Sequence, residues 1–162
     1  MFYEFLQNNS GGRFDVDERV CHRLFIEANS DDEAVSKAEE LGCYWDGVAN
    51  GVDCPCCGDR WYRDYLRTIQ IEKYKVEGLT VNTYSDTHQD AVSRWNEKYG
   101  KYECVSPPTY TKLFGNEIFE GKISFRNIEE YAQFFADEYG FTVPDARVYY
   151  KDGSVKEIYK ER

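Results

Sequence analysis

The residues with the clearest capacity for chemistry are three cysteines within four positions, in the stretch DCPCCGDRW. Two thiolates three positions apart can bind one metal ion, because the intervening turn points both sulfurs inward and a following glycine accepts the strained backbone. Cys54 and Cys57, followed by Gly58, fit this zinc-knuckle pattern and are the predicted first pair of ligands. Cys56 either replaces Cys57 in a different turn or stays free.

A closed structural zinc site needs four ligands, and the sequence contains no second knuckle of the same kind. His22 and Cys43 are the predicted remaining ligands, with Cys21 as a substitute and Cys104 as a distant candidate. Cys21 and His22 alternate along a predicted strand, so only one of them normally faces the loop. The sequence thus predicts one structural zinc ion.

The same loop allows other chemistry. The spacing from Cys54 to Arg60 matches the Cys-x5-Arg phosphate loop of cysteine phosphatases, but Pro55 lacks an N–H group and the loop carries an aspartate that would face an anion. A thiol–disulfide cycle within the loop and inert thiols are further alternatives. Arg60, Trp61 and Arg63 are the candidates for binding a small anionic ligand, although pairing and packing over the loop is the simpler expectation for Arg60 and Trp61.

The elements around the loop begin with three predicted strands, at residues 2–5, 13–17 and 21–28, with a tight turn at NNSGG. An amphipathic helix follows, with Ser30 as the N-cap and Gly42 at its end.

Two further amphipathic helices are predicted within residues 85–100 and 127–140, each ending at a glycine. Strand-like segments lie between and after these helices, at residues 67–76, 79–84, 117–125, 146–150 and 154–159. Because the segments lack a regular βαβ order, the predicted class is α+β, a mostly antiparallel sheet with about three helices and the cysteine loop. The expected division is into residues 1–66 and 67–162, packed together.

The composition of the chain narrows the classes of partner that it can bind. The net charge of −10 disfavours direct binding of nucleic acid, whereas an acidic surface attracts basic proteins. The 14 Tyr and 10 Phe are enough to place aromatic rings on the surface as well as in the core. The sequence shows neither a secretory signal nor a run of about 18 apolar residues that would span a membrane. It therefore predicts an intracellular protein with reduced thiols.

The N-terminal third resembles a group of small uncharacterised proteins encoded by tailed bacteriophages of Gram-positive hosts. The resemblance rests on FLQNNSGGRF, CHRLFIEA, EAVSKAEELGCYWDGV and DCPCCGDRW, and covers about residues 1–64. It implies an accessory protein in the cytoplasm of the infected cell, with no activity assigned to the group.

The sequence accordingly favours a non-enzymatic protein that binds a host or anti-phage defence protein through an acidic, Tyr-rich surface. The first alternative is a protein that sequesters a signal nucleotide, with aromatic rings on the base and Arg60 or Arg63 on the phosphate. The second is a thiol- or metal-dependent enzyme, which requires an open metal position or a cysteine of low pKa.

Overall fold

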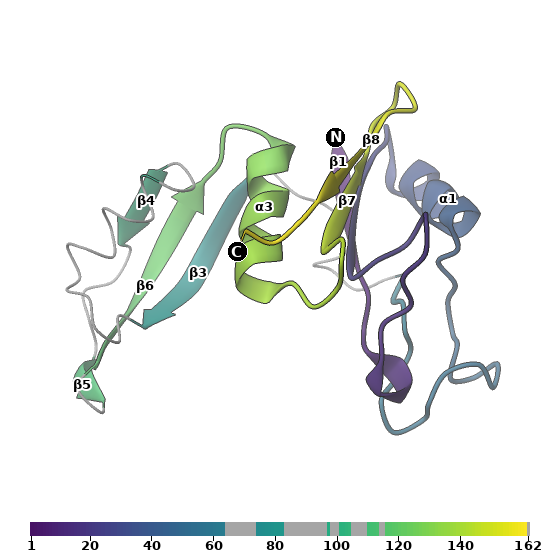
Figure 1. Cartoon of the computed structure of the whole chain (residues 1–162), viewed down its shortest axis with the longest axis horizontal. Helices are drawn as coiled ribbons and strands as arrows, with labels where there is room; N and C mark the ends of the chain where they lie inside the picture. Colours follow the sequence, from purple (N-terminus) through teal and green to yellow (C-terminus); the bar gives the residue numbers. More distant parts are fainter. Residues whose placement is uncertain (64–73, 83–96, 98–100, 105–109, 114–115, 162) are drawn as a thin grey trace. The chain divides into compact units, whose positions relative to one another are not determined.

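The computed structural model describes residues 1–63, 74–82, 97, 101–104, 110–113 and 116–161. The chain forms two compact units (Figure 1). The first unit joins Met1–Ile71 to Ala132–Arg162, and the second is Glu72–Tyr131. This grouping differs from the division expected near residue 66, because the C-terminal strands pair in one sheet with the N-terminal strands.

A four-stranded mixed sheet is the centre of the first unit, with the strand order β1-β2-β7-β8. Its strands are β1 (Phe2–Leu6), β2 (Arg23–Glu27), β7 (Ala146–Tyr149) and β8 (Val155–Ile158). Strands β2 and β7 run parallel, whereas β1 with β2 and β7 with β8 run antiparallel. Antiparallel pairs predominate among the described strands, as expected, but β2 and β7 are a parallel exception, since a long crossover brings the chain back beside β2 in the same direction.

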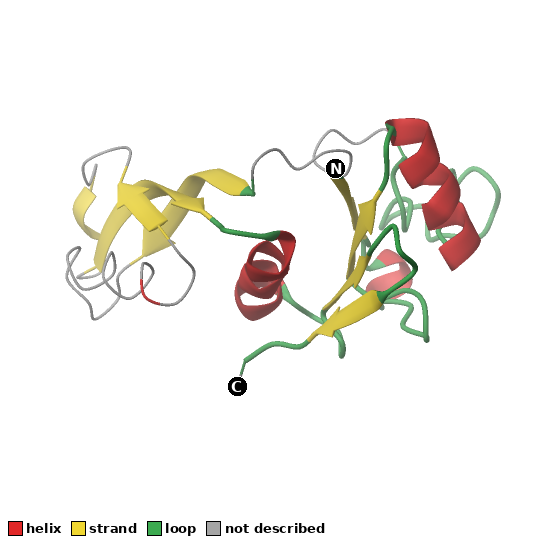
Figure 2. Ribbon diagram, turned by 90° about the horizontal axis from the view of Figure 1, so that it is seen from above, coloured by secondary structure: helices red, strands yellow, loops and turns green. Residues whose placement is uncertain are grey.

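The predicted first helix is confirmed as α1 (Asp31–Leu41). The Ser30 hydroxyl accepts a hydrogen bond from the Glu33 amide at 3.2 Å, and Gly42 ends the helix with a φ of 114°. Helix α1 lies along one face of the sheet (Figure 2). The core on this face takes alternate residues of β1 and β2 together with small residues of the helix: Tyr3, Phe5, Leu24, Ile26, Ala34 and Ala38.

The segment between β1 and β2 is a long connection rather than the predicted hairpin with a strand at residues 13–17. It contains one short 3-10 turn, η1 (Ser10–Gly12), and no strand. The Gln7 side-chain amide donates to the carbonyls of Asp15 and Cys21, both at 2.9 Å. Strand pairing is absent from this connection because side chains, rather than a neighbouring strand, satisfy its backbone groups.

The helix predicted within residues 127–140 is confirmed as α3 (Ile128–Tyr139), with the Asn127 side chain accepting from the Glu130 amide at 2.9 Å. Its C-terminal two thirds, from Ala132 onward, belong to the first unit. There the Arg23 guanidinium lies 4.1 Å from the centre of the Phe135 ring and pairs with Glu4 at 2.5 Å. This ion pair is buried on the sheet face opposite to the α1 core.

The second unit holds an antiparallel sheet of the order β3-β6-β4, with β5 also paired to β6. Its strands are β3 (Lys75–Asn82), β4 (Lys101–Cys104), β5 (Tyr110–Leu113) and β6 (Asn116–Ser124). The helix predicted within residues 85–100 falls almost wholly outside the described residues. In the described part of the chain, the α-helices are α1 and α3, where about three were expected.

None of the described helices combines the length and the apolar composition that crossing a membrane requires.

Candidate metal centre in the cysteine loop

The three loop cysteines occupy a tight turn that follows α1 and its glycine-rich connection. The amides of Cys57 and Gly58 donate to the Cys54 carbonyl at 3.2 and 3.1 Å. Gly58 has a φ of 87°, which glycine adopts without the steric cost paid by other residues. The turn therefore closes on itself, and its three cysteine side chains come from one short backbone segment.

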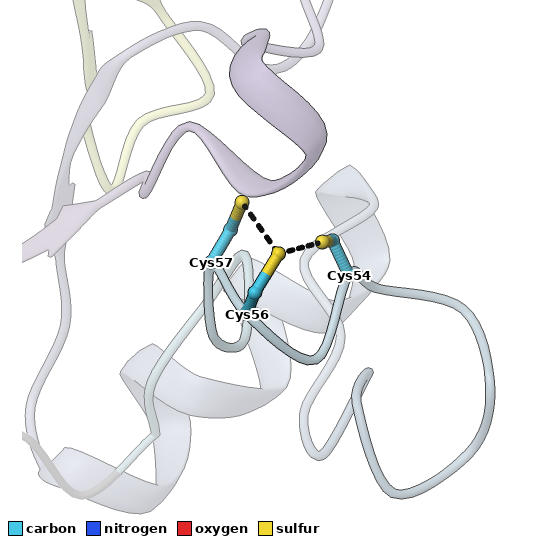
Figure 3. A group of neighbouring side chains, drawn as sticks. All are labelled: Cys54, Cys56 and Cys57. Carbon is cyan, nitrogen blue, oxygen red and sulfur yellow. Dashed lines mark hydrogen bonds between the residues drawn. The ribbon is translucent and has the colours of Figure 1, made fainter.

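Three sulfurs converge at this turn (Figure 3). The Cys56 sulfur lies 2.9 Å from that of Cys54 and 3.9 Å from that of Cys57, and all three lie within 4.8 Å of one another. Two sulfurs bound to the same tetrahedral zinc ion at about 2.3 Å are about 3.8 Å apart. Small side-chain rotations would thus place all three sulfurs on one metal ion.

Two of the loop cysteines, Cys54 and Cys56, have shifted pKa values. Hydrogen bonds from Cys56 and Cys57 lower the pKa of Cys54 to about 7, and the same contact with Cys54 raises the pKa of Cys56 to about 11. Cys54 is half-buried, while Cys56 and Cys57 are exposed. One thiolate is therefore available near neutral pH, the form that binds a metal ion or acts as a nucleophile.

Side chains from the connection after β1 hold the turn in place. The Asn8 side-chain amide donates to the carbonyls of Cys57 at 2.8 Å and Asp59 at 3.1 Å. The Cys54 amide donates to the Ser10 hydroxyl at 3.1 Å. The position of the sulfurs is thus set by contacts across more than 40 residues of sequence, as well as by the local turn.

A buried arginine joins the same two segments. The Arg60 guanidinium donates to the carbonyls of Ser10 at 2.8 Å and Arg13 at 2.7 Å, and to the Gln7 side-chain oxygen at 3.1 Å. Its Nε lies 3.1 Å from a carboxylate oxygen of Asp15. Arg60 is only 5% exposed, so its positive charge serves the packing of the connection against the loop.

Asp53 completes this network next to the first cysteine. Its carboxylate accepts from the Tyr44 hydroxyl at 2.7 Å and from the Arg60 amide at 2.8 Å. A Cβ atom at Gly47 would fall 1.8 Å from an Asp53 carboxylate oxygen, so the glycine is needed for the backbone to pass this close. The buried carboxylate is therefore held by the loop rather than presented to a ligand.

The structure does not bring His22 and Cys43 to the loop. Within the described residues, the group of close metal-ligating atoms consists of Cys54, Cys56 and Cys57. His22 instead packs against the rings of Phe14 and Phe141, with ring centres 4.7 and 5.4 Å away. Burial, reinforced by the charge of Arg23, lowers its pKa to about 4.

Cys43 and the substitute candidate Cys21 belong to the core under α1. Burial raises the pKa of Cys43, and raises the pKa of Cys21 to about 11. Both are neutral thiols near pH 7 and act as small apolar side chains. The expected ligand set is thus replaced by one in which Cys56 joins Cys54 and Cys57.

The three residues predicted to bind a small anionic ligand, Arg60, Trp61 and Arg63, do not form a common site. Trp61 is 2% exposed and part of the α1 core, so it offers no ring for stacking, and the donors of Arg60 are engaged as described. Arg63 is exposed and lines a cavity of about 160 Å³ with Asp31 and Asp32. Two carboxylates beside a single arginine disfavour a phosphate group in that cavity.

The proximity of Cys56 was the feature that the knuckle pattern missed. The pattern assigns metal binding to the first and last cysteines, because these point inward in a standard turn. Three cysteines in four residues are themselves a signal, since any tight turn keeps their sulfurs within a few ångströms. Cys104, the distant candidate, cannot be placed against the loop because its side chain lies outside the described part. The same holds for all of His88, the second of the two histidines in the sequence.

Residues 1–103 match the model of a family described as a domain of unknown function, DUF7296, and the chain belongs to this family. The match includes the mixed-sheet strands β1 and β2, helix α1 and the cysteine loop. No curated protein and no solved structure matches the chain.

Proposed function

We propose that this protein is a non-enzymatic binding protein, in which zinc on the cysteine loop stabilises the first unit and an acidic, aromatic surface docks a partner protein. The partner class that fits is a basic protein of the host or of its anti-phage defences. This assignment joins the acidity of the chain to the phage context implied by the sequence resemblance.

The observation that carries the proposal is an apolar patch, formed by the exposed side chains of Phe141 and Val143 and by the half-buried ring of Phe14. Phe141 is 74% exposed and Val143 is 63% exposed. The rings of Phe14 and Phe141 stack with an interplanar angle of 8° and a centre distance of 5.9 Å. Grouped apolar side chains of this kind are typical of interfaces, whereas single exposed ones are ordinary.

The net negative charge of the chain favours a positively charged partner. With a net charge of −10, the protein attracts a positively charged surface at long range and repels an acidic one. A partner that presents an apolar side chain among lysines or arginines would match both the patch and the charge. The steering component weakens as salt rises, because the Debye length falls to about 8 Å at physiological ionic strength.

The polar groups beside the cysteine loop support a binding role over catalysis. Asp53, Tyr44 and Arg60 are hydrogen-bonded to one another or to backbone carbonyls. None of these three groups is therefore left to act as a general acid, general base or anion-binding group beside the cysteines. Their mutual engagement is what a structural network requires.

The test is capture of a partner from lysate of a Gram-positive host, with wild-type protein and two surface variants. Phe141→Ser removes the exposed ring of the patch. Tyr159→Ser removes a ring that is 51% exposed on the C-terminal segment, and is the matched control. We expect one protein at stoichiometric yield, lost with Phe141→Ser, retained with Tyr159→Ser and weakened by salt.

Recovery of no protein at stoichiometric yield would refute partner binding. Equal recovery by both variants would refute the patch as its surface. Elemental mass spectrometry of the untagged protein tests the zinc separately, with about one ion per chain expected.

A further inference from the structure

The positions of the three loop sulfurs say more about the metal site than the presence of ligands. All three come from residues 54–57, and their mutual distances lie within 4.8 Å. Sulfurs that belong to one tight turn approach an ion from one side. The exposure of Cys56 and Cys57 places the opposite side of such an ion toward solvent.

The described residues supply no fourth ligand at this position. The nearest carboxylate in sequence, that of Asp53, accepts hydrogen bonds from the Tyr44 hydroxyl and the Arg60 amide. The Asp59 carboxylate accepts from the Val48 amide at 2.8 Å. Both flanking acids are therefore used by the backbone and side chains of the loop.

We propose that Cys54, Cys56 and Cys57 form an open three-thiolate metal site, whose fourth position takes a neutral imidazole from outside the chain. This inference rests on the metal-binding part of the proposed function. A tetrahedral zinc site with three protein ligands keeps one position for an external group. The metal ion would thereby bind an external ligand as well as stabilise the loop.

The charge of the site disfavours a negatively charged fourth ligand. Three thiolates around a divalent ion leave a net charge of −1, within a chain that already carries −10. A fourth thiolate or a carboxylate would add another negative charge, whereas imidazole adds none. Imidazole is also a ligand that zinc accepts readily. The donor is supplied either by a small imidazole compound or by a histidine side chain.

The turn is held ready for this role before metal binds. The side chains of Asn8 and Ser10 hold the backbone of the turn from one side. A preformed ligand set loses less conformational entropy on binding than a flexible segment does. The anchoring contacts lie on the backbone and leave the sulfurs accessible.

The experiment uses cobalt(II) in place of zinc, on the full chain. The intensity of the sulfur-to-cobalt charge-transfer band counts the bound thiolates, and the visible bands report the fourth ligand. We expect the intensity of wild-type protein to fall by about one third in Cys56→Ser, and to stay unchanged in Cys43→Ala. Titration with free imidazole should shift the visible bands saturably.

A second titration, with N-acetylhistidine amide, separates the two sources. A shift with both compounds indicates a position that accepts a side chain, and a shift with free imidazole alone indicates a small-molecule position.

Three results would overturn the open site. The first is an unchanged charge-transfer intensity in Cys56→Ser, and the second is a visible spectrum that responds to neither imidazole compound. The third is a change in the visible bands on Cys104→Ser or His88→Asn, because the chain would then supply its own fourth ligand. If neither cobalt nor zinc binds, the metal-binding part of the proposed function also fails, whereas binding through two cysteines refutes the three-thiolate site alone.

Discussion

Substitution of Arg60 by glutamine tests whether this residue serves the fold or a ligand. The change removes a buried guanidinium that donates to the carbonyls of Ser10 and Arg13 and to the Gln7 side chain. It also leaves the carboxylate of Asp53 without a charge partner 3.9 Å away. Removing one partner of a buried charged network costs about 3–5 kcal/mol, because the remaining groups stay buried and unsatisfied.

This loss is a large fraction of the free energy of unfolding of a typical domain, which is about 5–15 kcal/mol. With a urea dependence of about 2 kcal/mol per molar, the unfolding midpoint should fall by about 2 M. Tryptophan fluorescence reports the transition, since the neighbouring Trp61 is buried in the same core. Arg63→Gln, at an exposed position, is the matched control and should change stability by less than about 0.5 kcal/mol.

A free energy of unfolding for Arg60→Gln within about 1 kcal/mol of the wild-type value would contradict the structural role. Arg60→Lys adds a second measurement, because it keeps the charge but cannot make the forked set of hydrogen bonds. We expect it to lie between the wild type and Arg60→Gln. A lysine variant as stable as the wild type would show that charge alone, and not the geometry of the fork, is required.

Three further predictions concern pH, the buried ion pair and the metal. Because burial lowers the pKa of His22 from its ordinary 6.5 to about 4, the neutral ring contributes stability in full above pH 6.5, and this is lost as the pH falls toward 4. The loss is at most about 3 kcal/mol, and it should be absent from the stability-versus-pH curve of His22→Phe; the same loss in that variant would contradict the assignment to His22. Glu4→Leu should lower the free energy of unfolding by about 3 kcal/mol, because it leaves the Arg23 charge buried without its ion-pair partner. The double variant Glu4→Leu with Arg23→Leu should recover most of this loss, and a double variant as unstable as Glu4→Leu alone would contradict the prediction. Chelation should lower the melting temperature of the wild-type protein, because a bound metal ion stabilises the folded state, but it should not lower that of Cys57→Ser. Cys104→Ser should respond to chelation as the wild type does. An identical response of all three proteins would show that the ligand assignment is wrong.

Local chemistry was readable from the sequence because its causes lie within a few residues. Ser30 and Gly42 delimit α1 through a side-chain cap and a left-handed backbone, both of which depend on residue type alone. The Asp152-Gly153 pair likewise predicts the reversal between β7 and β8. The metal-binding capacity of the loop belongs to the same class, since the spacing of its cysteines limits how far apart their sulfurs can lie.

The partners of buried groups were decided only by the tertiary structure. His22 and Cys43 have the chemistry of metal ligands, but the sheet and α1 direct them into packed surroundings away from the loop. Arg60 has the chemistry of a phosphate ligand, but its donors meet carbonyls of Ser10 and Arg13, about 50 residues earlier in the chain.

The parallel pairing of β2 with β7 depends in the same way on distant residues. No local pattern encodes such contacts, because each depends on which segments the whole chain brings together. The sequence therefore determined the caps, the turns and the kind of metal donor, whereas the fold determined which of the candidate side chains are exposed to use their chemistry.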